Sequence, residues 1–259
     1  MHYGCIGQEF YIGRYLYLSK ELERLPNITF GIKNNKPIVR IKRTDPQTSK
    51  TTVNRIGDKN PNWQKYCAIA KRREHLQEQL GCLLRNWDED YGGSLENVAS
   101  GYMLVLPLVN SNYNCEFWNS LKSNSDTYEN KYPIRHKDFI MRSQFEVDVA
   151  TVLDSLGLDY KYEVKILFGN KEYFPDMAVN LPEYDRCGFV EAMGGMDSLK
   201  YVSHNMEKLN KYINYGLFPN RDVAIIPGER GDYPDRLLIK RLVGNMLTSI
   251  AGMYVFKKS

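Results

Sequence analysis

The chain has 259 residues, of which 42% are hydrophobic and 25% are charged, and its formal net charge at pH 7 is +4. This is enough material for a substantial core or for two small domains. There is no run of about eighteen apolar residues and no signal-peptide pattern, which excludes a membrane-spanning or secreted protein. We therefore expect a cytoplasmic protein that contacts no membrane, with its five scattered cysteines present as reduced thiols.

The first elements that the sequence predicts are two short strands, at residues 28–32 and 37–42, with a turn at Asn34 and Asn35 between them. The segment 44–60 contains Thr, Asn and Gly and is expected to be a loop. Residues 63–87 have the pattern of a long helix that is basic at its start and acidic at its end. A small α+β region at residues 1–109 is therefore expected.

Positive charge is concentrated in this region. Between residues 33 and 73, twelve basic residues face two acidic ones, which gives a local net charge of +10. Such a patch suits the phosphates of a nucleic acid, although a solubilising charged loop is an open alternative. The residues expected to contact phosphates are Lys36, Arg40, Lys42, Arg43, Lys71, Arg72 and Arg73.

The middle of the chain contains the signals of a domain boundary. A break at Tyr91, Gly92 and Gly93 precedes an apolar run at residues 102–109, and a polar stretch follows it. We expect residues 110–134 to be a linker and residues 135–259 to be a second domain.

The second domain begins with a predicted amphipathic helix at residues 142–156. Glu146 lies three, four and seven positions before Val149, Ala150 and Leu153, which places it on the core-facing side. A carboxylate there is costly unless it meets a cation, a donor or water. The alternative is a glutamate at the edge of the stripe that reaches solvent.

Residues 160–167 and 172–179 are predicted to form a hairpin around a turn at Gly169 and Asn170. Pro175 indicates a bulge or an unpaired edge position beside Asp176. The next strand, at residues 187–193, is a buried apolar run interrupted by one acid, Glu191, which needs an explanation.

A helix at residues 198–215, a buried strand at 222–227 and a closing helix or two at 235–254 complete the predicted order of an α/β fold. The helix at 198–215 carries two stripes, of which we expect the first to face the core and the second to face elsewhere, with its lysine able to point back toward the sheet. These stripes are Val202, Met206, Leu209 and Ile213, and then Tyr201, Asn205, Lys208 and Tyr212.

Residues 140–227 resemble the PD-(D/E)xK nuclease superfamily. Pro175 and Asp176 match the first half of the motif, and Glu191 matches the acid of the second half, but Met193 stands where the motif has lysine. The chain is similar to a branch in which the lysine has moved to the following helix, in the pattern Lys, three residues, Tyr, three residues, Gly. Its matching features are Lys208, Tyr212 and Gly216, the upstream Arg142, Ser143 and Glu146, and the pair Tyr162 and Glu163.

The resemblance implies a restriction-endonuclease-like core, a central mixed sheet flanked by helices, and a Mg2+-dependent endonuclease that hydrolyses DNA, with Mn2+ as a substitute ion. It implies that Asp176 and Glu191 bind the metal, that Lys208 acts on the attacking water or the developing charge, and that Glu146 binds a second ion or a metal-bound water. Glu163 and Tyr212 are auxiliary candidates, and Glu163 is alternatively a solvated strand residue.

Two other classes of function remain open. The fold is alternatively an inactive DNA-binding module, for which Met193 in the place of lysine is the sign. It is alternatively the nuclease subunit of a larger DNA-processing or mobile-element complex whose protein partner supplies targeting, since the chain has no phosphate-loop motif of a nucleotide-driven motor. A homodimer is expected if both strands of a duplex are cut, because that usually needs two active sites.

Overall fold

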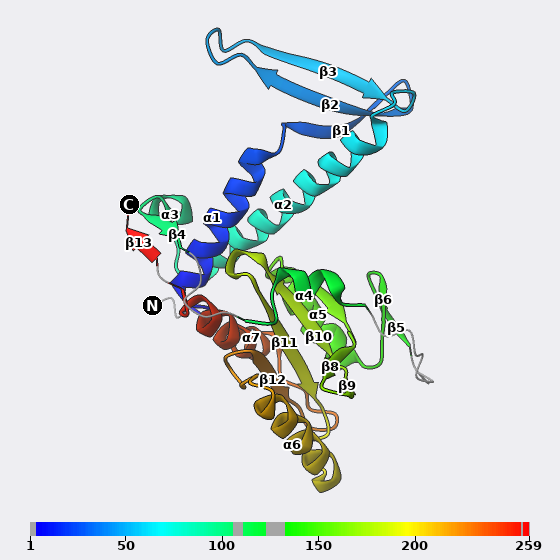
Figure 1. The fold of residues 1–259 in the computed structure, drawn as a ribbon, viewed down its shortest axis with the longest axis vertical. Coiled ribbons are helices and arrows are strands. Elements are labelled where there is room, and N and C mark those ends of the chain that lie inside the picture. Colours follow the sequence, from blue (N-terminus) through cyan, green and yellow to red (C-terminus); the bar gives the residue numbers. More distant parts are fainter. Residues whose placement is uncertain (1–3, 106–110, 123–132, 255, 259) are drawn as a thin grey trace.

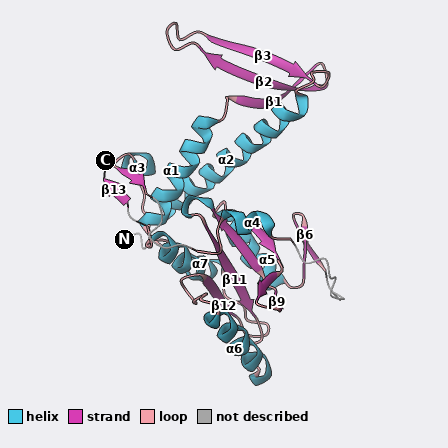
Figure 2. Ribbon diagram, in the orientation of Figure 1, coloured by secondary structure: helices cyan, strands magenta, loops and turns pink. Residues whose placement is uncertain are grey.

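The computed structural model describes residues 4–105, 111–122, 133–254 and 256–258 (Figure 1). The fold is mixed α/β, with helices and several separate sheets (Figure 2). None of the helices in these ranges combines the length and the apolar content needed to cross a lipid bilayer. In chain order the elements are α1 (Gln8–Arg24), β1 (Ile28–Lys33), β2 (Lys36–Thr44), β3 (Thr51–Gly57), α2 (Trp63–Asp90), α3 (Leu95–Ala99), β4 (Tyr102–Leu104), α4 (Cys115–Ser120), β5 (Ile134–His136), β6 (Phe139–Met141), α5 (Gln144–Ser155), β7 (Asp159–Tyr162), β8 (Ile166–Phe168), β9 (Lys171–Tyr173), β10 (Met177–Leu181), the 3-10 turn η1 (Pro182–Tyr184), β11 (Arg186–Met193), α6 (Leu199–Asn214), β12 (Val223–Pro227), α7 (Arg236–Ala251) and β13 (Phe256–Lys258).

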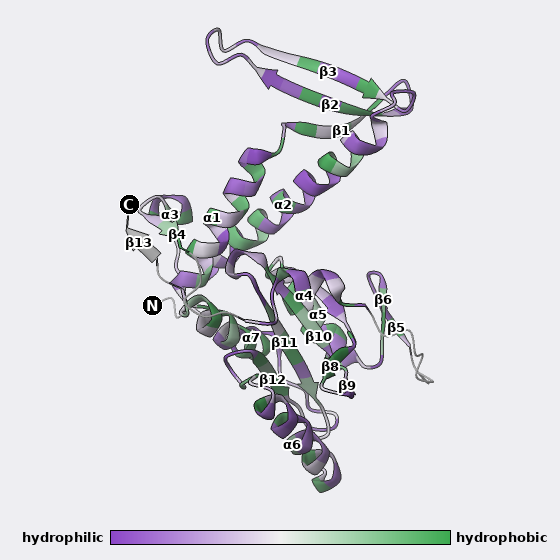
Figure 3. Cartoon of the chain, in the orientation of Figure 1, coloured by the Kyte–Doolittle hydropathy of each residue, from purple (hydrophilic) through white to green (hydrophobic). Residues whose placement is uncertain are grey.

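The sheet that positions the candidate site has four strands in the order β12-β11-β10-β7. Strand β10 is antiparallel to both β7 and β11, whereas β11 and β12 run parallel, so the sheet is mixed. Strands β10, β11 and β12 are mainly apolar because both faces are covered. Figure 3 shows hydrophobic segments on these strands and hydrophilic segments along α2 and at the far end of β2.

Different elements cover the two faces of this sheet. One face packs on α5, α7 and α1, where Met177, Val190 and Ala224 meet Val149 and Val243. The opposite face packs on α4, the β8 strand and the end of α6, through side chains that include Phe117, Phe168, Phe189 and Tyr212. The second face is the one on which Glu191 lies, since Glu191 and Phe189 are two residues apart on β11.

The N-terminal part forms an arm that projects from the core. Helix α1 runs away from the core and α2 returns to it, and a three-stranded antiparallel sheet, β1-β2-β3, lies at their far end (Figure 1). Ile28, Val39 and Ile41 of this sheet pack on Ala70 of α2. The turn predicted between the first two strands is confirmed, with Asn34 at φ 50° and its neighbour at φ 58°, as a two-residue type I′ hairpin requires.

The base of this arm belongs to the main core. Phe10 and Leu18 of α1 and Trp87 of α2 lie in the same buried cluster as the helices and strands of the second half of the chain. Arg14 of α1 forms a buried ion pair with Glu183 at 2.9 Å. The segments on both sides of the boundary expected at residue 109 therefore share one hydrophobic core.

Several local predictions differ from the structure. Helix α1 was not predicted. Strand β3 occupies residues 51–57 of the expected loop at 44–60, because its Thr, Val and Ile side chains suit a strand that pairs with β2. Part of the expected linker at 110–134 is folded: α4 packs on β10 and β11 through Phe117 and Trp118. Residues 106–109 of the apolar run and 123–132 of the linker lie outside the described residues.

The hairpin predicted for residues 160–179 is split into two pairs. Strand β7 ends at Tyr162 and pairs with β10, while β8 and β9 form a separate two-stranded sheet. The interruption falls at Glu163, which has φ 43° and whose N–H donates to the Asp176 carbonyl at 3.0 Å. This break turns Glu163 toward the pocket described below.

Candidate active site

Glu191 is the most buried acid of the candidate site, with 1% of its surface exposed. It lies on β11, and helix α6 supplies both of its partners: Lys208 Nζ lies 2.5 Å from Oε2, and the Tyr212 hydroxyl donates to Oε1. Lys208 also donates to the Phe174 carbonyl at 3.3 Å. The lone acid in a buried strand is thus explained by a cation and a hydroxyl one helical turn apart.

Asp176 lies immediately before β10, on the strand next to Glu191. Its Oδ2 accepts a hydrogen bond from the Ala192 N–H at 2.8 Å, and 7% of the residue is exposed. Pro175 precedes it and has no N–H to donate, so the regular ladder of β10 begins after it. The return strand expected at residues 172–179 is interrupted here, between β9 and β10, and the Asp176 carboxylate lies against the backbone of β11.

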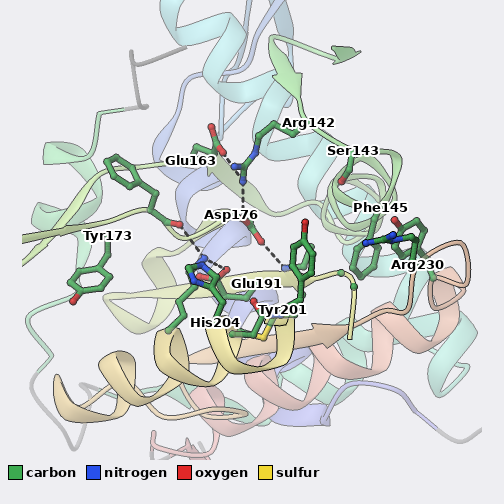
Figure 4. Close-up of a pocket in the computed structure, with 18 of the residues that line it drawn as sticks. Arg142, Ser143, Phe145, Glu163, Tyr173, Asp176, Glu191, Tyr201, His204 and Arg230 are labelled. Atoms are coloured by element: carbon green, nitrogen blue, oxygen red, sulfur yellow. Dashed lines mark hydrogen bonds and ion pairs between the residues drawn. The ribbon is translucent and has the colours of Figure 1, made fainter. Parts of the chain in front are cut away.

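Arg142 stands among three carboxylates. Its Nη2 lies 2.8 Å from Glu163 Oε1, 3.4 Å from Asp176 Oδ1 and 3.5 Å from Glu146 Oε1. Figure 4 shows its side chain pointing at both Glu163 and Asp176. The sequence pattern included Arg142 as part of a motif but did not assign it to the site. Arg142 is central because three carboxylates from different parts of the chain surround it, which the sequence does not show.

Glu146 closes the start of α5. Its Oε2 accepts hydrogen bonds from the backbone N–H groups of Arg142 and Ser143, at 2.8 and 3.2 Å, and from the Tyr162 hydroxyl at 2.8 Å. Ser143 in turn caps the Glu146 N–H, so the two residues form a capping box. Glu146 does not line the pocket. Its oxygens hold the start of α5 and face Arg142, and its role in binding a second ion or a metal-bound water stays a prediction.

A pocket of about 640 Å³ opens beside these residues and is lined by Glu163, Asp176, Glu191 and Lys208, among others. At one end Phe145 and Tyr233 stack with ring centroids 4.6 Å apart. Arg230 lies near Phe145 and Tyr173 stands at the opposite end (Figure 4). His204, Lys211 and Arg230 also line the pocket and were not predicted. The only sequence signal was for His204, which is four residues before Lys208 on α6.

Carboxylates outnumber cations only in the cluster around Arg142 and Lys208, where the four acids Glu146, Glu163, Asp176 and Glu191 meet these two bases. The pocket lining as a whole has four acids and four bases, since Glu172, Lys211 and Arg230 also line it and Glu146 does not. Burial raises the pKa of Glu191 to about 8, and the Asp176 charge adds to this while Lys208 opposes it. Burial also raises the pKa values of Glu146 and Glu163. Burial would lower the pKa of Lys208, but Glu191 and Asp176 outweigh it and raise that pKa.

This donor set fits a hard divalent cation. Asp176 and Glu191 offer carboxylate oxygens at an open pocket whose lining also carries the cations Arg142 and Lys208. Within the described ranges, no three His, Cys, Asp or Glu residues are grouped as metal ligands. Two carboxylates are still sufficient for Mg2+, which commonly takes one or two and completes its shell with water and phosphate oxygens.

The two stripes of α6 are only partly placed as expected. Asn205 and Tyr212 of the second stripe are buried and Lys208 is half-buried, but Tyr201 is 49% exposed. In the expected core stripe Val202 and Leu209 are half-buried, and Met206 and Ile213 are each 41% exposed. The expectation that the lysine points back toward the sheet is confirmed, because it pairs with Glu191.

The basic residues expected to bind phosphates are not equivalent. Lys36, Lys42, Arg43, Lys71 and Arg72 are exposed and Arg40 is half-buried. Arg73 instead donates to the Leu22 and Leu25 carbonyls, at 2.9 and 3.3 Å. It satisfies the C-terminal end of α1, so its assignment as a DNA contact does not fit.

Comparisons with models of protein families, with curated proteins and with solved structures find no significant match to this chain.

Proposed function

We propose that the chain is a Mg2+-dependent DNA endonuclease of the PD-(D/E)xK superfamily, from the branch whose catalytic lysine is carried by the helix after the glutamate strand. The observation that carries the proposal is the pairing of Lys208 on α6 with Glu191 on β11, at 2.5 Å, beside Asp176. The order α5, β7, β10, β11, α6, β12 supports a restriction-endonuclease-like core of a mixed sheet flanked by helices.

In this proposal each residue of the chain has a distinct task. Asp176 and Glu191 would hold Mg2+, which when bound supplies charge neutralisation at the phosphate and activation of water. Lys208 keeps a cation at the pocket, where it stabilises charge that develops on the phosphate oxygens in the transition state. The Tyr212 hydroxyl fixes the Glu191 carboxylate from the side opposite the lysine. Arg142 holds Glu163 and Asp176 in place.

The test is cleavage of labelled duplex, single-stranded and branched DNA with Mg2+, Mn2+ or EDTA. We expect the wild-type protein to cut with either metal but not with EDTA, and Asp176→Asn to abolish cutting. Asp148→Asn is the matched control, because Asp148 lies on α5 outside the pocket and pairs with Arg236. It should cut as the wild type does.

Two results would contradict the proposal. If a variant with both Asp176→Ala and Glu191→Ala still cuts DNA in the presence of metal, these residues are not the metal ligands. If the wild-type protein binds DNA but cuts none of the panel with any metal, the chain is an inactive nuclease-fold binding module.

A further inference from the structure

We propose that the outer face of the β1-β2-β3 sheet docks the phosphate backbone of duplex DNA at a distance from the pocket. The outer face is the side of the sheet that points away from α2. The proposal rests on the proposed function for the choice of DNA as the nucleic acid, but the docking surface itself requires no metal and no catalysis.

The strand register defines the outer face. Directly opposite residues of antiparallel strands lie on the same face. Arg40 of β2 is opposite Thr29 of β1 and Arg55 of β3, and Lys36 is opposite Lys33. Their neighbours on β2 point the other way, where Val39 and Ile41 pack against α2. The residues of the outer face therefore alternate with the residues of the small core.

All the charged side chains of this face are positive. Among the described residues of the sheet it carries no acid, and it presents five cations: Lys33, Lys36, Arg40, Lys42 and Arg55. Four of them are exposed, Arg40 is half-buried, and none forms an ion pair with a described residue. Side chains two residues apart on a strand stand about 6.8 Å from each other, and adjacent strands are about 4.8 Å apart. Five unpaired cations at such spacings match a surface of closely spaced phosphates.

The centre of the outer face carries few side chains. Ile38, which is 7% exposed, is opposite Gly31 on β1 and Gly57 on β3, so two of the three positions in this row have no side chain. The Arg40 guanidinium lies across Gly31: a Cβ placed there would lie 2.7 Å from the Arg40 Cζ. The guanidinium thus lies along the sheet, where a phosphate can approach it.

The composition of the face favours a duplex over a single strand. Proteins that bind single strands stack bases on aromatic side chains. Within the described sheet the outer face has no aromatic residue, since Phe30 lies opposite Val39 on the α2 side. In a duplex the bases are already stacked and paired with each other, so the protein needs cations for the backbone but no aromatic side chains for the bases.

Helix α2 separates the docking face from the pocket. Its N-terminal end packs on the small sheet, its C-terminal end lies in the main core, and its 28 residues span about 42 Å. The small sheet lies at the end of the molecule opposite α6 (Figure 1). At 3.4 Å per base pair, a stretch of duplex as long as α2 contains about 12 base pairs. A duplex that reaches both the small sheet and the pocket would therefore extend beyond the cut by a length of this order.

The test uses the variant Lys36→Gln/Arg40→Gln/Lys42→Gln and a labelled DNA duplex of about 40 base pairs, several times the span above. Binding is measured by fluorescence anisotropy in EDTA over a series of salt concentrations. Each lost phosphate contact lowers the slope of log K against log salt by about 0.9, so the variant should lose about 2.7 and bind about tenfold or more weakly at low salt. Circular dichroism checks that the variant is folded, and the single variants should each lose about 0.9.

The matched control is Lys20→Gln/Lys59→Gln/Lys65→Gln. It removes the same charge from exposed lysines of the same arm, but these lie on α1, in the turn before α2 and on α2, outside the outer face. Its salt slope should stay near that of the wild type. Equal losses in the two variants would overturn the docking surface, and so would wild-type binding to single-stranded DNA or to duplex RNA as tightly as to duplex DNA.

The two proposals fail in different ways. If the face variant loses binding while the wild-type protein cuts no DNA, the docking surface holds and the nuclease proposal fails. If the wild-type protein cuts DNA while the face variant binds normally, the nuclease proposal holds and the docking surface is refuted. A second readout is a series of duplexes with the cut site at increasing distances from one end. Cleavage that is independent of this distance below about 12 base pairs would also refute the docking surface.

Discussion

The buried ion pair between Arg14 and Glu183 can be removed from either side, and the cost follows from its geometry. Arg14 Nη1 donates to both oxygens of Glu183, at 2.9 and 3.1 Å, and the two side chains are 2% and 0% exposed. Arg14→Leu leaves the Glu183 carboxylate buried without its cation, which costs about 3–5 kcal/mol of the free energy of unfolding. Since most native proteins are stable by only about 5–15 kcal/mol, this is a large fraction.

The double variant Arg14→Leu/Glu183→Leu should recover most of that loss. Replacing a whole buried pair by apolar side chains is often neutral. What remains is the Gly157 carbonyl, which accepts from Arg14 Nη2 at 2.7 Å in the native protein. An unsatisfied buried acceptor costs about 1–3 kcal/mol, so the double variant should lie that far below the wild type, well short of the sum of the single variants.

The assay is urea unfolding followed by circular dichroism. Arg24→Leu is the control, because Arg24 pairs with Glu21 at a similar 2.8 Å but its side chain is 63% exposed, and its loss should cost less than about 1 kcal/mol. If Arg14→Leu costs no more than Arg24→Leu, or if the two single losses simply add, the argument from burial is refuted. Two separate unfolding steps in the wild type would contradict a core shared by α1 and the second half of the chain.

Three further predictions concern the site and its surroundings. Lys208→Ala should lower cleavage about 10²- to 10³-fold while DNA binding, measured by anisotropy, stays within a few-fold, because the lysine acts on the transition state; weak binding with normal turnover would contradict this. Ser143→Ala removes the cap of α5 and should cost about 1 kcal/mol in urea unfolding, and an unchanged midpoint would refute the capping role. The hydrogen bond to Asp159, 2.7 Å away, raises the pKa of His75 in the folded protein above its value in the unfolded chain. Protonated His75 therefore stabilises the fold fully at pH values below the unfolded pKa, and this stabilisation is lost as the pH rises through the folded pKa. The difference in free energy of unfolding between wild type and His75→Gln should therefore be larger at acidic than at basic pH. The change should be no more than about 0.5 kcal/mol, because the His75 side chain is 44% exposed. A difference that grows with pH would refute this reasoning.

Elements with strong local signals were predictable from the sequence. The stripe of Phe145, Val149 and Leu153 predicts the helix that the structure places at Gln144–Ser155. The apolar run around Glu191 predicts β11 within one residue of its observed start, Arg186. In both cases the residues that form the element also carry the apolar pattern, so the signal is contained within a single short window.

Elements that depend on distant partners were not predictable. Helix α1 buries Arg14, whose partner Glu183 is 169 residues away, so a charge interrupts its otherwise apolar core face. Strand β7 ends where Glu163 takes a positive φ and donates its N–H to the carbonyl of Asp176, which lies just before another strand. Local patterns contain no information on either contact.

The same reasoning applies to the candidate site. Lys208 and Tyr212 were identified through the resemblance, although the hydrophobic pattern of α6 placed them outside the expected core stripe. Their burial is stabilised by one carboxylate, Glu191, which no window of α6 contains. The burial of the second stripe and the position of the candidate site thus have the same cause: polar side chains of α6 turn inward because the buried acid needs partners.

The division of the site between β11 and α6 has a mechanical consequence. The carboxylates belong to a sheet that is packed on both faces, whereas the cation belongs to a helix whose outward side is exposed, including Leu199 at 87% and Met206 at 41%. Lys208 and Tyr212 lie on one helix, so a rotation of α6 would change both of their distances to Glu191 together. A force applied to the outward side of α6 would therefore alter both contacts of the buried carboxylate at once.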